Sequence, residues 1–552
     1  MLRSSQVNLK ILIWALLAIA IITVVFARKG ALQDVHWDAP IYLLHGKEFA
    51  ETPYLRDYVM HASEIAESLP RFKLNEDQGT PYWGFMRLGN TILIGALTAA
   101  AGASLGAVDL VFWTYTFLLA AAVVLAILCS LRLVDLLGSD VSKRSAVKGA
   151  IISGALYMAS DVYRYLSGNL VAEIPALFLL TGSVLALVEA IRLRAVSLAI
   201  LSGGLGFALY VVKIDAVFNY VSFILAFWAI LAYHDGKKMW WPGCFIAAFS
   251  AVVLYAVYAW WFWPLPDPRL FLVFEQLHEA FGLNPVLPIK LYFVAGGALW
   301  IGFLLALRYR MRDRAMWLAV AWLILVFLPY SETIFHGRQA QTRWFALIMP
   351  PLLLGSTLGW ASLADRVTEN RVHKATVPFI AACALVLIAL SQAESYAWLR
   401  QLPGGWRLQH VKEWLSPPKY ERLFYPVEEL KEISHFVYNG HGPTVVVVDQ
   451  GKYEEYFHII AYLGPRLGPS SEQLATHDAS VPICGVRKLR PEIDAVTFCI
   501  TRPSAETIAQ LRGKVRVFYL RHVGDPIAPE ESQREAVVFA TRSLILSTSI
   551  AP

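Results

Sequence analysis

Charged side chains are scarce in this chain. Asp, Glu, Lys and Arg make up 16% of its 552 residues, whereas soluble domains carry about 25%. Hydrophobic residues make up 57%, and the mean hydropathy is +0.50. This composition excludes a string of soluble domains, and we predict an integral membrane protein.

Cysteine is also rare, with five residues in the whole chain. Cys129, Cys244 and Cys383 fall in apolar segments and lack the short spacing of metal ligands. Cys484 and Cys499 share a polar region, and a disulfide between them is open if that region lies outside the cytosol. The cysteines therefore predict no metal site.

Twelve apolar stretches are candidates for membrane-spanning helices, which need about 17–25 residues. They cover residues 11–27, 88–106, 110–131, 148–160, 174–191, 195–212, 214–232, 242–263, 288–307, 315–330, 343–361 and 376–393. The first stretch lacks the cleavage site of a signal peptide, and we interpret it as a retained span. Four glycines, at positions 89, 95, 102 and 106, lower the helix propensity of the second stretch, and we predict that it does not cross.

Basic residues cluster in every second loop between the apolar stretches. The clusters are Arg132/Lys143/Arg144/Lys148, Arg192/Arg194, Lys237/Lys238, Arg308/Arg310/Arg312/Arg314 and Arg366/Arg371/Lys374. Because cytoplasmic loops carry an excess of Lys and Arg, we place these loops in the cytoplasm together with the N-terminus. This arrangement predicts about eleven spans, with everything after residue 394 outside the cytosol. It also accounts for the net charge of +6 without a nucleic-acid partner.

The composition changes near residue 402 from apolar to that of a soluble protein. We therefore predict an α-helical polytopic membrane domain over residues 1–395 and a small extracytoplasmic α/β domain over 402–552. The first domain includes a long outer loop over 28–109, with an amphipathic surface helix over 53–69. In the second domain, alternating strands and helices indicate a partly parallel sheet. The predicted strands cover 444–449, 495–501 and 515–520, and the predicted helices cover 452–462 and 504–512.

Acidic and basic residues gather where the outer ends of the spans are predicted. They are Asp34, Asp38, Asp161, Glu173, Lys213, Asp215, Arg338 and Arg343. Ionisable groups beside hydrocarbon are costly, so they tend to mark a substrate or ion site. A carboxylate can take the proton of an acceptor hydroxyl, and cations can bind a phosphate that leaves with growing negative charge. The sequence has no glycine-rich phosphate loop, which argues against a soluble nucleotide-sugar donor. The acids and cations therefore predict group transfer from an anionic, lipid-linked donor.

Two of the acids stand in informative sequence contexts. Asp38 and Tyr42 form a D-x-x-x-Y pattern a few residues after the first predicted span. Glu173 directly precedes an apolar run that opens with Pro175. Both acids therefore lie at the outer boundary of the predicted membrane domain.

Two of the basic residues complete a series of four features. The glycine-rich stretch 203–206 leads to Lys213, and Arg343 precedes an aromatic pair and an apolar stretch with Pro350. In this order, over roughly residues 8–395, the features resemble the GT-C superfamily of membrane glycosyltransferases. Within it, they are most similar to the protein O-mannosyltransferases and lipid A aminoarabinose transferases.

The resemblance implies an enzyme that moves a hexose or pentose from a polyprenyl-phosphate donor to an acceptor, with inversion at the anomeric carbon. The acceptor would be a glycan, a lipid or a protein at the outer face of a bacterial inner membrane, among membrane lipids. The implied roles are general base for Asp38, acceptor- or donor-site acids for Glu173 and Asp161, phosphate binding for Lys213, Arg343 and Arg338, and support for Tyr42 and His336. The sequence identifies no metal ligands and leaves a divalent cation open as a cofactor.

Simpler roles are open for the same residues. The alternatives are a helix N-cap for Asp38, an ion pair with Arg164 for Glu173, a lipid-headgroup contact for Lys213, a loop position for Asp161 and interface anchoring for Arg338 and Arg343. Two other functions are also open, a transporter of a lipid-linked or anionic substrate and an inactive GT-C-like scaffold. Ala39 stands where the family often has a second acid, which favours the scaffold, whereas the presence of Lys213 and Arg343 argues against it, because a scaffold needs no phosphate-binding cations. Secondary transporters place such charges near the bilayer midplane, which argues against the transporter.

Overall fold

The computed structural model describes residues 42, 43, 46, 49, 88–101, 105–160, 162, 163, 166, 170–235, 240–261, 296–336, 342–369, 376–391, 427–438, 444–448, 496–499, 516–523, 535–542 and 544–549. The first predicted span lies outside this part of the chain. So do the predicted surface helix over 53–69 and the predicted helices over 452–462 and 504–512.

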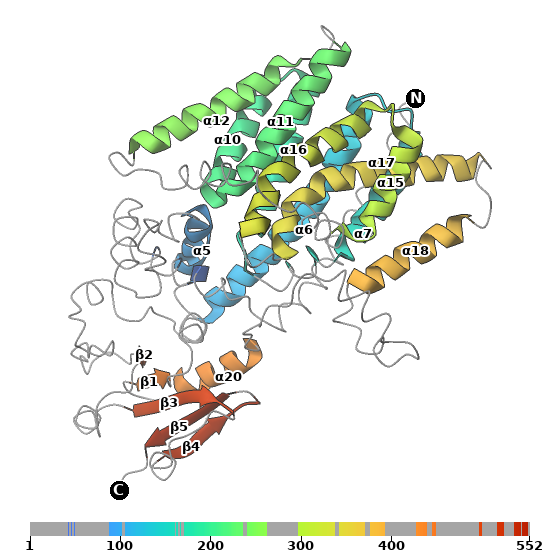
Figure 1. Cartoon of the computed structure of the whole chain (residues 1–552). Coiled ribbons are helices and arrows are strands. Elements are labelled where there is room, and N and C mark those ends of the chain that lie inside the picture. Colours follow the sequence, from blue (N-terminus) through green and yellow to red (C-terminus); the bar gives the residue numbers. More distant parts are fainter. Residues whose placement is uncertain are drawn as a thin grey trace, which may run out of the picture. The chain divides into compact units, whose positions relative to one another are not determined.

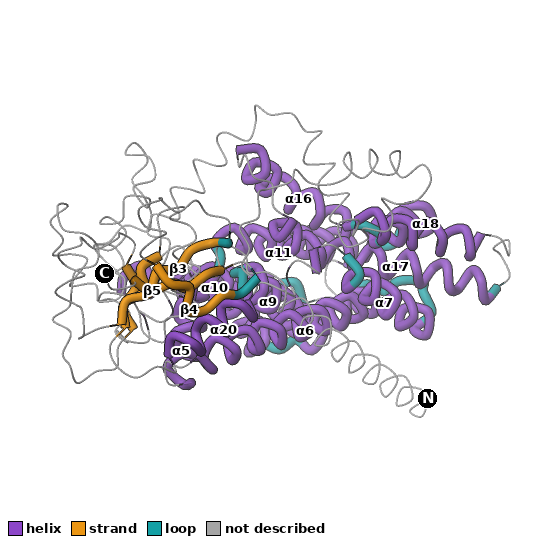
Figure 2. Tube along the Cα trace, turned by 90° about the horizontal axis from the view of Figure 1, so that it is seen from below, coloured by secondary structure: helices purple, strands orange, loops and turns teal. Residues whose placement is uncertain are grey.

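Every described element up to Tyr438 is a helix (Figures 1 and 2). The helices are α5 (Leu88–Ala101), α6 (Leu105–Leu136), α7 (Lys143–Met158), α9 (Glu173–Leu193), α10 (Val196–Val212), α11 (Ile214–Asp235), α12 (Pro242–Trp261), α15 (Leu299–Arg310), α16 (Arg314–His336), the 3₁₀-helix η2 (Thr342–Ile348), α17 (Met349–Thr368), α18 (Thr376–Ser391) and α20 (Val427–Tyr438). From α5 to α18 they fall on the predicted apolar stretches. Helices are expected there, because a helix satisfies its own backbone groups in hydrocarbon.

Among the described residues, five helical segments are long and apolar enough to cross a membrane: Leu110–Leu136, Glu173–Leu193, Ala216–Tyr233, Pro242–Trp261 and Phe345–Thr368. Shorter apolar helical segments are Leu88–Ala101, Val196–Val212 and Arg314–Val326. The described part of helix α5 has 14 residues. That this stretch does not cross the membrane, and the count of eleven spans, stay predictions.

The chain divides into two compact units. The helical unit contains residues 1–30, 115–167 and 172–421, and the mixed unit contains residues 31–114, 168–171 and 422–552. Helix α6 belongs to the mixed unit up to Thr114 and to the helical unit from Tyr115.

Helix α17 is the most buried helix segment of the helical unit among those that could span a membrane. It packs against α7, α15 and α16 (Figure 1). Gly359 of α17 lies so close to the Gly302 carbonyl of α15 that a Cβ atom would overlap it. Gly149 of α7 lies similarly close to the backbone of Thr357. Small residues let helix backbones approach in this way, and van der Waals contact then holds the helices together in lipid.

Helix α12 exposes large apolar side chains instead of burying them. Phe249 is 69% exposed and Trp260 is 77% exposed, while α10 packs on another part of the helix. An apolar face of this kind marks a surface that is covered in the native environment. In a chain of this composition, the cover is the hydrocarbon of the membrane.

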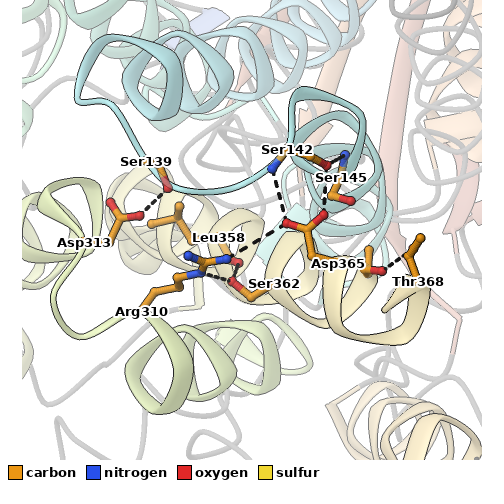
Figure 3. A network of polar contacts seen from close by, with 10 residues as sticks. Ser139, Ser142, Ser145, Arg310, Asp313, Leu358, Ser362, Asp365 and Thr368 are labelled. Carbon is orange, nitrogen blue, oxygen red and sulfur yellow. Dashed lines mark hydrogen bonds and ion pairs between the residues drawn. The ribbon is translucent and has the colours of Figure 1, made fainter. Parts of the chain in front are cut away.

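A polar network joins three loops at one end of the helical unit (Figure 3). Asp365, near the end of α17, accepts hydrogen bonds from the Ser142 hydroxyl at 2.8 Å and from the Ser142 N–H at 3.2 Å. The Arg310 guanidinium lies 4.0 Å from the same carboxylate, and the Ser139 hydroxyl donates to Asp313. The loop after α6, the turn between α15 and α16, and the end of α17 are therefore held together.

Four of the five basic clusters reach this same end, and the fifth, Lys237/Lys238, lies outside the described residues. Arg132 of α6 forms an ion pair with Glu189 of α9 at 2.9 Å, and Arg192 donates to that carboxylate at 2.7 Å. Since α6 continues from Arg132 to the polar network, these contacts bring α9 to the end that carries Arg310 and Arg366. The predicted grouping of these loops on one side is seen in the structure. That this side faces the cytoplasm stays a prediction.

The mixed unit contains a five-stranded sheet in the order β2-β1-β3-β5-β4 (Figure 1). The strands are β1 (Thr444–Val448), β2 (Val496–Cys499), β3 (Arg516–His522), β4 (Glu535–Ala540) and β5 (Leu544–Ser549). β1 pairs in parallel with β2 and β3, whereas β5 pairs in antiparallel fashion with β3 and β4. Helix α20 packs against the sheet, where the Phe436 ring stacks on Phe539 with 4.8 Å between centroids.

Strands β1, β2 and β3 correspond to the three strands predicted from the sequence, and they have the predicted parallel pairing. Buried parallel strands form continuous apolar runs, which are easily recognised. The sequence analysis does not predict α20, β4 or β5. That the segment forms a separate extracytoplasmic domain stays a prediction.

Candidate functional site

Glu173 and Lys213 form an ion pair inside the helical unit. The Lys213 ammonium lies 3.3 Å from Glu173 Oε1, and the two side chains are 4% and 0% exposed, respectively. The sequence predicts both as site residues but does not predict that they pair. Because a buried charge is costly without a partner, each side chain compensates the charge of the other.

Both residues lie at helix ends whose dipoles suit their charges. Glu173 is the first residue of α9, where backbone N–H groups carry partial positive charge. Lys213 is the C-cap residue of α10, and its own N–H donates to the Leu209 carbonyl. Its backbone is extended, with φ −159° and ψ 105°, so the break between α10 and α11 falls on the lysine itself. The carbonyl end of a helix favours a cation at this position.

The ion pair lies at the end of the helical unit opposite the polar network. Glu189, which binds Arg132 at the network end, comes 16 residues after Glu173 in α9. That separation is about 24 Å along an α-helix, close to the thickness of the hydrocarbon core at about 30 Å. The pair and the basic loops therefore belong to opposite sides of the predicted membrane domain.

The 3₁₀-helix η2 carries Arg343, the predicted site arginine. It begins at Thr342, leads directly into α17, and packs against α9 and α11. Residues 345–348 are buried. The element that carries Arg343 therefore contacts both the helix that begins with Glu173 and the helix that follows Lys213.

Asn219 of α11 holds η2 by a side-chain hydrogen bond. Its side-chain amide donates to the Leu347 carbonyl, and its Oδ1 accepts from the indole N–H of Trp322 in α16 at 2.7 Å. Asn219 is 0% exposed and Trp322 is 1% exposed. The sequence analysis does not single out Asn219. The available signal is an amide inside the apolar stretch 214–232, because a polar side chain there needs a hydrogen-bond partner.

Tyr42 of the D-x-x-x-Y pattern lies in the mixed unit, where it is buried together with Leu43. One turn later, Gly46 lies against Ile94 of α5, and a Cβ atom on Gly95 would come within 2.8 Å of the Gly46 carbonyl. The backbone that follows the pattern therefore meets α5 at close range.

Two other predicted site residues belong to described helices. His336 is the last residue of α16, and Arg343 is the second residue of η2. Asp38, Asp161 and Arg338 lie outside the described residues.

No group of three or more His, Cys, Asp or Glu side chains that could hold a metal ion is found in the described part of the chain. A cavity of about 10 Å³ lies between α6, α9, α16 and α17, lined among others by Cys129, Thr181 and Trp322. That volume holds roughly one water molecule, and it is too small for a sugar ring.

No protein-family model and no curated protein matches the chain. Solved structures do match it. The crystal structure of ArnT from Cupriavidus metallidurans bound to undecaprenyl phosphate has a TM-score of 0.50 and 10% identity, covering 98% of each chain. The apo structure of the same ArnT has a TM-score of 0.48 and 11% identity, covering 100% of each chain. The oligosaccharyltransferase AglB from Archaeoglobus fulgidus, in complex with an inhibitory peptide and a dolichol-phosphate, has a TM-score of 0.41 and 14% identity, covering 82% of this chain and 64% of AglB.

At 10% identity, the likeness to undecaprenyl-phosphate-bound ArnT is one of fold, and it extends over nearly the whole of both chains. The resemblance predicted from the sequence is therefore confirmed as a likeness of fold. The chain has the fold of ArnT.

Proposed function

We propose that this protein is a glycosyltransferase that moves a sugar from a polyprenyl-phosphate donor to an acceptor at the outer face of a bacterial inner membrane. The N-terminus and the basic loops lie in the cytoplasm, and the segment after residue 394 lies outside. The proposal rests on the buried pair of Glu173 and Lys213, at the end opposite the basic loops of a chain with the fold of ArnT. The ArnT structure itself is bound to undecaprenyl phosphate.

Lys213 and Arg343 bind the phosphate of the donor, with Arg338 as a third cation. The packing of η2 on α9 and α11 supports this assignment, because it brings the backbone of Arg343 to the helices that begin at Glu173 and after Lys213. An ammonium has three N–H donors, so a contact with Glu173 is compatible with a phosphate contact. Glu173 orients the ammonium and balances its charge when no donor is bound.

The transfer step follows from this assignment. The acceptor hydroxyl attacks the anomeric carbon on the face opposite the phosphate, a new C–O bond forms, and the bond to the phosphate oxygen breaks. Both electrons of that bond leave with the polyprenyl phosphate, and the hydroxyl proton passes to the Asp38 carboxylate. Lys213 and Arg343 stabilise the negative charge that develops on the phosphate. The anomeric centre is inverted, and Asp161, Tyr42 and His336 support the reactants.

The geometry gives less support to a transporter. Transporters bind substrate near the bilayer midplane, at helices that are interrupted there. Glu173 and Lys213 instead lie at helix termini, about 24 Å from the basic end of α9. We therefore keep transfer as the proposed function.

The test is an assay of the purified protein in lipid nanodiscs with a panel of hexosyl and pentosyl polyprenyl phosphates. A membrane extract supplies acceptors, and mass spectrometry follows the release of polyprenyl phosphate. We expect turnover of at least one donor. Lys213→Gln and Arg343→Gln should each weaken donor use roughly ten- to a hundred-fold, since a hydrogen bond to a charged group contributes about 1.5–3 kcal/mol. Arg343→Lys should restore it only in part, because Lys lacks the planar two-pronged contact.

Arg312→Gln is the matched control, since it removes an exposed arginine at the opposite end of the helical unit. It should leave donor use unchanged. Normal binding of undecaprenyl phosphate without turnover of any donor would identify an inactive scaffold. Equal donor use by wild type, Lys213→Gln and Arg343→Gln would remove both cations from the site.

A further inference from the structure

We infer that Asn219 is a positioning residue for the donor phosphate, which holds η2 and thereby the Arg343 backbone in a fixed place relative to Lys213. This inference rests on the proposed function of the two cations. Asn219 itself touches neither donor nor acceptor in this account.

The contacts of Asn219 join three elements. Its amide group in α11 donates to the Leu347 carbonyl of η2 and accepts from the Trp322 indole of α16 at 2.7 Å. The Trp322 indole also donates to the backbone carbonyl of Asn219 at 3.2 Å. Trp322 therefore orients the Asn219 amide, and the amide in turn holds η2.

The link lies close to both cations along the chain. Asn219 follows Lys213 by six residues, about 9 Å along an α-helix. Leu347 follows Arg343 by four residues, about 8 Å along a 3₁₀-helix. A shift of η2 at Leu347 is therefore passed to Arg343 within little more than one turn.

η2 depends on an outside hydrogen bond because of its own geometry. The hydrogen bonds within a 3₁₀-helix are poorer than those of an α-helix, and longer runs are uncommon. η2 has seven residues, and the link from Asn219 is made at its sixth residue. The amide is uncharged, so it fixes η2 without competing for the phosphate. A misplacement of about 1 Å can cost about a hundred-fold in rate, so such a link affects the reaction.

The test compares Asn219→Leu and Trp322→Phe with Ser153→Ala in the full-length protein. Ser153 donates to Ser356 at 2.9 Å between α7 and α17, so Ser153→Ala removes another buried interhelical hydrogen bond that does not involve η2. Three quantities are measured: amide hydrogen exchange of residues 342–348, the Kd for undecaprenyl phosphate, and the midpoint of thermal unfolding.

We expect Asn219→Leu to speed exchange in residues 342–348 at least tenfold and to raise the Kd for undecaprenyl phosphate about tenfold. Trp322→Phe should change both quantities in the same direction by less. Ser153→Ala should lower the unfolding midpoint without changing either one. Asn219→Gln keeps the amide, and it should recover part of the affinity for undecaprenyl phosphate.

Unchanged exchange of residues 342–348 in Asn219→Leu would overturn the inference. So would faster exchange with an unchanged Kd, since η2 would then be anchored without positioning the phosphate. Lys213→Gln and Arg343→Gln, measured alongside, separate this failure from that of the proposed function. If these two variants also leave the Kd for undecaprenyl phosphate unchanged, the proposed phosphate site is wrong. If they raise the Kd and Asn219→Leu does not, only the positioning role of Asn219 is wrong.

Discussion

At the scale of single residues, Lys213 and Glu173 carry opposite charges in a place where neither is stable alone. Lys213→Gln removes the cation of the buried pair, and breaking a buried pair in this way costs about 3–5 kcal/mol. In the double variant Glu173→Gln/Lys213→Gln no charge is left buried, so we expect most of the stability to return. Binding of undecaprenyl phosphate should not return, because the ammonium is still missing. Thermal unfolding and ligand binding of the purified variants measure the two effects separately.

A double variant that binds undecaprenyl phosphate as tightly as wild type would make the pair purely structural. The lipid-headgroup contact that the sequence leaves open for Lys213 needs an exposed ammonium group, whereas the Lys213 side chain is 4% exposed. The alternative partner of Glu173, Arg164, lies outside the described residues.

The role of Asp38 as general base gives a second prediction at this scale. Asp38→Asn keeps the size of the side chain and most of its capacity to cap a helix, so a capping role predicts nearly normal activity. A catalytic role predicts a loss of about 10²–10⁴-fold in turnover with donor affinity kept, because Asn cannot take the acceptor's proton. Initial rates at saturating donor measure the difference.

Asp34→Asn is the matched control for Asp38→Asn, since Asp34 stands outside the D-x-x-x-Y pattern. It should cost far less activity. An inactive Asp34→Asn beside an active Asp38→Asn would shift the assignment by one helical turn, and two active variants would refute the mechanism.

At the scale of elements, the contact between α15 and α17 depends on the absence of a side chain. Gly359→Ala places a methyl group where the Gly302 carbonyl lies, so the two helices must move apart. Overpacking of this kind costs about 1–3 kcal/mol, and we expect a lower midpoint of thermal unfolding in detergent.

Gly182→Ala tests whether the effect comes from packing alone. The nearest atoms to its added Cβ are leucine methyl groups at 3.6 and 4.0 Å, which is ordinary contact. Alanine is favoured over glycine within a helix by about 1 kcal/mol, so Gly182→Ala should be neutral or stabilising. If both variants lower the midpoint equally, close packing of α15 on α17 is not the cause.

At the scale of the whole molecule, the structure places four of the five basic clusters at one end of the helical unit, and the proposed function requires that end to be cytoplasmic. Single cysteines at Arg144 and Arg312, both exposed at that end, should resist an impermeant thiol reagent added to intact cells. A cysteine in place of Asp267, in the predicted outer loop between the apolar stretches 242–263 and 288–307, should react. The five native cysteines are replaced first, and labelling is read by a mass shift of the protein.

Labelling of Arg144→Cys or Arg312→Cys in intact cells, with Asp267→Cys protected, would reverse the orientation. Lys213 and Glu173 would then face the cytosol, and a donor at the outer face could not reach them. Lysed cells, in which all three positions should react, show that the sites are accessible to the reagent.

The sequence by itself determined the features that depend on neighbouring residues in the chain. The apolar stretches predicted the helices from α5 to α18, because an apolar segment in hydrocarbon must satisfy its backbone groups internally. The valine run at residues 445–448 predicted β1, and the alternation of strands and helices predicted its parallel pairing. The basic clusters predicted which loops share a side, because Lys and Arg are enriched in the loops on the cytoplasmic side of a membrane.

Only the tertiary structure decided which side chains meet across helices. Glu173 and Lys213 are separated by 40 positions in the chain, and Asn219 and Leu347 by 128. Such pairs depend on where α9, α10, α11 and η2 pack, which is decided by the fit of side chains from segments far apart in the chain. The sequence therefore identified Lys213 and Glu173 as site residues. Their ion pair, and the hydrogen bond by which Asn219 holds η2, depend on how the helices pack.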